Sequence, residues 1–375
     1  MEYPRYIDIE QVEKDLLIKL AILFKDSLRD FSTSADRSMR YLDKIVFPII
    51  MASKEDKSYN PFSEIIEKYV LHILIRKFEK EGYNLLPLGF SADLTLENEQ
   101  HIISIDIKTA NITNLSDFKN TVNIGINQMT HVAKLCLKNK FLPAPYFVYP
   151  SIPPFYEMKD GSKKLILTYG LMFIYPSYKD LIEEIREDYI KLFKFFKSRI
   201  KKDLITIIKN DFDVSREYAE RILELKPRRS RFSRNELISE SLLRGIFTHK
   251  QEKDNILSSL KITGDERKII DEFSKNIEKF IFKLRDRDIK PIAIIAISIP
   301  NGLLKDYYCD KFVSGKDYCK SARYHYGEGI FKLMQEDSYI NKSRVIFLDI
   351  NNNYLKDLKR HFKRIIVLNQ KLEVL

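Results

Sequence analysis

GFSADLTLENEQHIISIDIKT, residues 89–109, predicts two strands joined by a polar turn. The first strand carries Asp93, and the second ends in Asp106-Ile107-Lys108. Because successive side chains of a strand point to opposite faces, Asp106 and Lys108 share one face, while isoleucines take the other. A carboxylate and an ammonium at the end of an apolar strand cost free energy unless each has a partner or a task.

The elements around this stretch predict a mixed sheet with helices on its flanks. Asn60-Pro61 is typical of a helix start, and the helix that follows carries Glu67 and ends at Gly82. After the two strands, a helix over 121–140 is expected to carry Gln128. Further strands are predicted at 146–149, 164–175, 291–297, 344–350 and 364–368, and further helices at 5–31, 36–51, 178–210, 215–225, 235–247 and 265–285.

This order of elements indicates an α/β (α+β) fold, with a mixed β-sheet core flanked by helices and a large helical insertion. We expect three regions along the chain. An N-terminal helical region covers 1–58, the core with the mixed sheet covers 59–177 together with 286–375, and the helical insertion covers 178–285.

Composition narrows the class of protein. The 375 residues include 64 Lys and Arg against 53 Asp and Glu, and this net charge of +11 favours a polyanionic partner, usually nucleic acid. The sequence has no long apolar run and no apolar signal core at its start, so we expect neither a membrane span nor secretion. The 3 cysteines lack metal-ligand spacing and suit a reducing, cytoplasmic location. No glycine-rich phosphate loop is present, so no nucleotide cofactor is expected.

Asp93, Asp106 and Lys108 suit metal-assisted cleavage of a phosphodiester bond. Two carboxylates bind a hard cation such as Mg2+ through their oxygens, with Mn2+ as an expected substitute. The cation polarises the phosphate and lowers the pKa of a bound water. The lysine can orient or help deprotonate the attacking water, or offset charge in the transition state. The alternative interpretation is a surface hairpin whose Asp and Lys form exposed ion pairs of little energetic value.

Two further side chains are candidates for the same site. Glu67 is either a further metal ligand or water-orienting group, or a boundary carboxylate paired to a lysine. Gln128 is a candidate for contact with the water or a phosphate, or it has a structural role only.

Helix, strand with Asp93, turn, strand with Asp106-Ile107-Lys108, and helix together resemble the PD-(D/E)xK nuclease core, over about residues 60–150. Within that superfamily the chain looks like a type II restriction endonuclease. Ala92 stands where the family motif has proline, a residue that binds no metal. The resemblance implies that the backbone carbonyl of Ile107 joins the two aspartates at the metal. It also implies a homodimer that cuts both strands of a short palindromic site in double-stranded DNA.

A basic run at 226–234, KPRRSRFSR, is the densest in the chain, and a proline places it in a loop between helices. Phosphates attract such a segment, and arginine is suited to bidentate contact with guanine. The insertion that contains it is therefore a candidate for DNA recognition and dimerisation, unless the run is only a solvated loop. The expected DNA contacts are Arg228, Arg229, Arg231, Arg234, Asn111, Asn114, Lys119 and Arg323.

The leading hypothesis is a Mg2+-dependent, sequence-specific double-stranded DNA endonuclease. One alternative is a repair or recombination nuclease with the same core, which selects DNA structure instead of sequence. An alternative of another class is a non-catalytic DNA-binding regulator, with a helix-turn-helix-like reader at 205–247.

Overall fold

The described part of the chain divides into two compact units in the computed structural model. The first is built from the described residues within Met1–Ala35, Phe62–Ser177 and Lys290–Leu375, and the second from those within Tyr178–Ile289. The structure describes residues 5–25, 27, 63–86, 92–111, 121–134, 147–175, 179–227, 232–248, 253–262, 264–286, 291–314, 320–327, 329–336 and 339–350.

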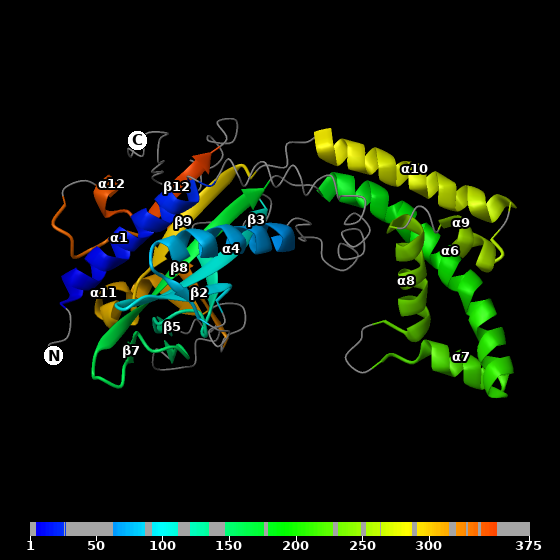
Figure 1. The fold of residues 1–375 in the computed structure, drawn as a ribbon, viewed down its shortest axis with the longest axis horizontal. Coiled ribbons are helices and arrows are strands. Elements are labelled where there is room, and N and C mark those ends of the chain that lie inside the picture. Colours follow the sequence, from blue (N-terminus) through cyan, green and yellow to red (C-terminus); the bar gives the residue numbers. More distant parts are fainter. Residues whose placement is uncertain are drawn as a thin grey trace, which may run out of the picture. The chain divides into compact units, whose positions relative to one another are not determined.

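A mixed sheet forms the centre of the first unit (Figure 1). Its path runs β1-β2-β3-β8-β9-β12, and β7 pairs with β8 beside this path. β3 and β8 are parallel, whereas the other pairs are antiparallel. The strands are β1 Asn84–Leu85, β2 Leu94–Glu97, β3 His101–Asn111, β7 Phe155–Glu157, β8 Lys163–Tyr175, β9 Ala293–Ile299 and β12 Val345–Ile350. The predicted mixed α/β class is therefore confirmed.

A second sheet lies in the same unit, in the order β4-β11-β10-β5-β6. Its strands are β4 Thr121–Gly125, β5 Ala133–Lys134, β6 Phe147–Val148, β10 Phe312–Ser314 and β11 Ser321–His325. The predicted helix over 121–140 is wrong, because Thr121–Gly125 pairs antiparallel with Ser321–His325. Burial of alternate side chains, Val122 and Ile124, against the core stabilises this strand.

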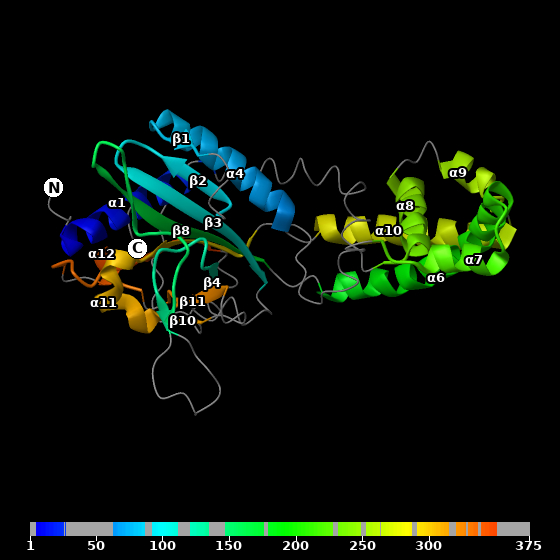
Figure 2. The ribbon, with the colours of Figure 1, turned by 90° about the horizontal axis from the view of Figure 1, so that it is seen from below.

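Helices cover the main sheet on the side away from the second sheet (Figure 2). These are α1 Tyr6–Lys25 and α4 Ser63–Lys80. An apolar core between the two sheets includes Ile295, Ile297 and Phe347, all almost completely buried. Between β9 and β12 lie the short elements η1 Gly302–Leu304, α11 Lys305–Tyr308, η2 Cys309–Lys311 and α12 Tyr339–Lys342.

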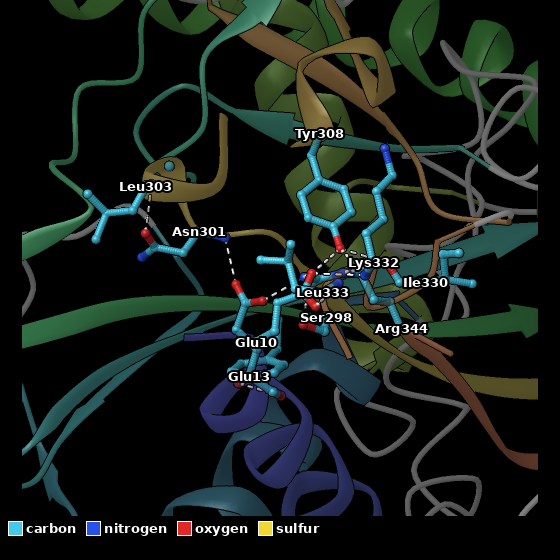
Figure 3. A network of polar contacts seen from close by, with 12 residues as sticks. Glu10, Glu13, Ser298, Asn301, Leu303, Tyr308, Ile330, Lys332, Leu333 and Arg344 are labelled. Atoms are coloured by element: carbon cyan, nitrogen blue, oxygen red, sulfur yellow. Dashed lines mark hydrogen bonds and ion pairs between the residues drawn. The ribbon is translucent and has the colours of Figure 1, made fainter. Parts of the chain in front are cut away.

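A buried charged cluster fixes α1 to this unit (Figure 3). Arg344, with none of its surface exposed, lies 2.7 Å from Glu13 and 3.2 Å from Glu10. Tyr308 donates a hydrogen bond to Glu10, and the arginine side chain stacks 4.5 Å from the tyrosine ring centre. Desolvation raises the pKa of the Glu13 carboxyl, and the guanidinium of Arg344 opposes that effect. Loss of any one of these buried charges would leave its partner buried without compensation, so the cluster is stable only when it is complete. The cluster therefore specifies where α1 packs.

Helices make up the second unit: α6 Lys179–Phe212, α7 Arg216–Glu224, α8 Arg234–Thr248, α9 Lys253–Ser259 and α10 Gly264–Asp286. Ser215 caps α7 by accepting from the Tyr218 amide. A capping box begins α8, because Ser233 and Glu236 exchange hydrogen bonds. The helices predicted at 178–210, 215–225, 235–247 and 265–285 are thus confirmed within a few residues.

Candidate active site

Strands β2 and β3 bring Asp93 next to the strand that carries Asp106. Leu94 pairs with Ile105 across the two antiparallel strands. Asp93, just before β2, accepts a hydrogen bond from the main-chain N–H of Ile107 at 2.6 Å. The carboxylate of Asp93 is therefore bound to the strand that carries Asp106.

Asp106 lies at the centre of the site and is only 1% exposed. Lys108 Nζ lies 3.0 Å from its Oδ1, to which it donates, and 2.9 Å from Oδ2. Gln128 Nε2 donates to the same Oδ1 at 3.0 Å. Oδ2 is buried as well, and the Lys108 ammonium forms its ion pair there. Asp93, Asp106, Lys108 and Gln128 therefore form one cluster in the described fold.

Burial governs the electrostatics of this cluster. Desolvation raises the pKa of Asp106 from 3.8 to about 6, the Lys108 ammonium opposes the rise, and the nearby Asp93 carboxylate adds to it. A second positive charge beside the two carboxylates would stabilise the ionised form of Asp106.

Gln128 reaches Asp106 from a tight turn and not from the helix that the sequence predicted. The turn follows β4, and Gln128 N donates to Gly125 O at 2.9 Å. The side-chain Oε1 accepts from Gly125 N at 2.8 Å. The amide is thus held at one end by its own turn and points the other end at the carboxylate.

Glu67 lies half-buried on α4. That helix packs against α1, β1 and β3, so it flanks the strand with Asp106. Its role as a ligand remains a prediction.

Of the expected DNA contacts, some lie among the described residues and others lie outside them. Arg234 is exposed at the first position of α8, and Arg323 is half-buried on β11. Asn111 is the last residue of β3, where its backbone pairs with Tyr175, and its side chain is outside the described residues. Arg228, Arg229, Arg231, Asn114 and Lys119 also lie outside the described residues.

Several residues that support the site were not predicted from the sequence. Thr168 on β8 donates to the carbonyl of Gln128 at 3.2 Å. Thr130 and Asn301 also fix this region, and Glu10 and Glu13 are buried on α1. Only the glutamates left a signal in the sequence, since they stand three residues apart beside apolar positions of a helix.

No described group of three or more His, Cys, Asp or Glu side chains is arranged to hold a metal ion. Among the described helices, none is both long enough and apolar enough to span a membrane.

Comparison with known proteins shows what the chain is similar to. Slightly less than half of it is similar to type II restriction enzymes, in agreement with the resemblance of the sequence. The particular family model that matches, over residues 5–180, is described as the N-terminal domain of the type II restriction enzyme MwoI.

Two solved structures are similar to the chain at low identity. The restriction endonuclease BglI, bound to its DNA recognition sequence, is 12% identical, with 84% of this chain and 89% of that chain covered and a TM-score of 0.36. The tetrameric restriction endonuclease SfiI, bound to cognate DNA, is 10% identical, with 80% and 78% covered and a TM-score of 0.31. No curated protein matches the chain.

Proposed function

We propose that this protein is a type II site-specific deoxyribonuclease, which hydrolyses phosphodiester bonds of double-stranded DNA at a short sequence and requires Mg2+. The cluster around the buried Asp106 carries the proposal. Lys108 and Gln128 both contact the Asp106 carboxylate, and Asp93 binds the main chain of the same strand at Ile107. The match of residues 5–180 to a restriction-enzyme family model supports the same activity.

The residues present fit a divalent cation. Asp106 Oδ2 is buried beside the Lys108 ammonium, and the carboxylate of Asp93 is near enough to raise the pKa of Asp106. Two carboxylates in this relation attract a hard cation with oxygen ligands. Asp93 and Asp106 would hold the ion, with the Ile107 carbonyl as the proposed third ligand and Glu67 as a further candidate. When bound, Mg2+ supplies charge that polarises the phosphate and acidifies a water.

The side chains around the cation have separate tasks. Lys108 is 38% exposed while its partner Asp106 is 2% exposed at the side chain, so the ammonium extends from the buried acid toward solvent. From there it can contact a phosphate oxygen and stabilise the negative charge that grows in the transition state. Gln128 is fixed by its turn, so it holds the Asp106 carboxylate in one orientation.

Charge and exposed polar groups support DNA as the substrate. The net charge of +11 attracts phosphates. On the second sheet, Arg323 of β11 pairs in register with the exposed Asn123 of β4. Both side-chain types hydrogen-bond phosphates and base edges. Arg234 of α8, in the helical insertion, is a further proposed contact with DNA.

We further propose that two copies act together as a homodimer on a palindromic site, because two equivalent sites related by a two-fold axis cut both strands symmetrically. The helix-turn-helix alternative has one observation in its favour: three residues, 213–215, separate the end of α6 at Phe212 from the start of α7 at Arg216, which is the turn length of that motif. DNA binding without cleavage would favour it.

The experiment is to incubate the purified protein with long duplex DNA and Mg2+, beside the variant Asp106→Ala. We expect discrete fragments from the wild type and none from the variant. DNA binding without cleavage in any divalent metal would reject the proposal. Cleavage restricted to branched DNA would favour the structure-selective nuclease instead.

A further inference from the structure

The position of the Gln128 amide is set by the main chain of 125–131. Both ends of its side chain are engaged, since Oε1 accepts from Gly125 N at 2.8 Å and Nε2 donates to Asp106 Oδ1 at 3.0 Å. The main-chain carbonyl of the same residue accepts from Thr168 Oγ1 at 3.2 Å. A small shift of this main chain would therefore separate the amide from the carboxylate.

Gly302 approaches that main chain too closely for any side chain. Its N–H donates to Thr130 Oγ1 at 2.9 Å. A Cβ at position 302 would lie 2.1 Å from the carbonyl oxygen of Thr130 and 2.9 Å from its carbonyl carbon. Both are main-chain atoms that cannot swing aside, so any larger residue would displace the backbone two positions from Gln128.

Asn301 fixes Gly302 from the other side. Its Nδ2 donates to the carbonyls of Pro154 at 2.9 Å and Ile166 at 2.8 Å, and its main-chain N–H donates to Glu13 Oε1 at 2.6 Å. Figure 3 shows this last contact, which joins the loop after β9 to the charged cluster on α1. The asparagine is 1% exposed, so these bonds are shielded from water.

We propose that Asn301 and Gly302 are positioning residues for the active site: they hold Thr130, and through it the Gln128 turn, so that the Gln128 amide meets Asp106. The catalytic consequence rests on the proposed endonuclease function. The hydrogen bond between Gly302 and Thr130 does not depend on nuclease activity. The positioning role and the proposed nuclease function can therefore be rejected independently.

Substitutions at Thr130 test the proposal without the backbone clash that Gly302→Ala would introduce. Thr130→Val removes the hydroxyl acceptor at nearly constant volume, and Thr130→Ser retains it. We expect the valine variant to cleave DNA about 10-fold to 100-fold more slowly in single turnover, with unchanged DNA affinity in Ca2+, while the serine variant cleaves at nearly the wild-type rate. On a Gln128→Ala background, Thr130→Val should have no further effect, because both act through one contact. Equal losses in both Thr130 variants, or losses that add to those of Gln128→Ala, would overturn the proposal.

A spectroscopic measurement gives an answer that does not depend on cleavage. The side-chain amide resonance of Gln128 is identified in a 15N NMR spectrum as the signal absent from Gln128→Ala. We expect it to shift in Thr130→Val and to stay in place in Thr130→Ser. If the resonance shifts in Thr130→Val but the wild-type protein cuts no DNA, the proposed function is rejected and the positioning role stands. An unmoved resonance in Thr130→Val would reject the positioning role.

Discussion

The carboxylate of Asp106 is buried, so replacing it with a neutral side chain should stabilise the protein at alkaline pH. Burial is the main cause that raises its pKa from 3.8 to about 6. The difference corresponds to about 3 kcal/mol, at about 1.4 kcal/mol per pH unit. Because the folded-state pKa is raised, the protonated acid contributes stability that is complete below pH 3.8 and is lost as the pH rises through about 6.

Asp106→Asn keeps the shape of the side chain without the charge. We expect it to increase the free energy of unfolding by up to about 3 kcal/mol at pH 8 and by about 1 kcal/mol at pH 4.5. Urea unfolding followed by circular dichroism at both pH values measures the difference. The measurement is made without divalent metal, which would stabilise the wild type by binding.

Asp211→Asn is the matched control, since Asp211 is exposed near the end of α6. Its unfolding free energy should change by less than about 0.5 kcal/mol at either pH. If Asp106→Asn is less stable than the wild type at pH 8, or gains the same amount at both pH values, the reasoning about burial at this site is wrong.

Lys108→Ala should bind DNA with nearly wild-type affinity in Ca2+ yet cleave it about 100-fold more slowly with Mg2+, since the ammonium acts on the transition state; normal cleavage in a rapid-quench assay would contradict its role. Ca2+ in place of Mg2+ should support DNA binding without cutting, because it fills a carboxylate site with looser geometry; efficient Ca2+-driven cleavage would count against the mechanism. Arg344→Met should lower the unfolding free energy by about 3–5 kcal/mol in urea, because two buried glutamates lose their cation; a loss below about 1 kcal/mol would show that the cluster is not compact in solution. Arg323→Ala should weaken DNA binding in a gel-shift assay more than Arg5→Ala, a matched loss of charge at an exposed position of the N-terminal segment, and equal effects would reject a specific contact.

Local patterns predicted much of the fold, because they depend on neighbours in the sequence. The apolar run at 291–297 became most of the fully buried strand β9, and the paired strands around Asp93 and Asp106 formed as their alternation indicated. The helices of the second unit also followed from spacing and caps.

Contacts between distant residues could not be predicted in this way. Residues 121–125 were misassigned to a helix, because their pairing partner at 321–325 lies far along the chain. For the same reason no local pattern indicates that Arg344 contacts Glu10 and Glu13, or that Gly302 contacts Thr130. Gln128 was a candidate for the site, but its actual contact with Asp106 depends on the turn that replaced the helix.

Mapping the ends of the DNA fragments produced from a long duplex in Mg2+ tests site-specific cleavage at Asp106 directly. We expect every end from the wild type to fall at one short sequence, and Asp106→Asn to produce no ends while still binding the DNA. Ends scattered without a common sequence, or identical ends from the variant, would show that the protein is not the proposed site-specific nuclease.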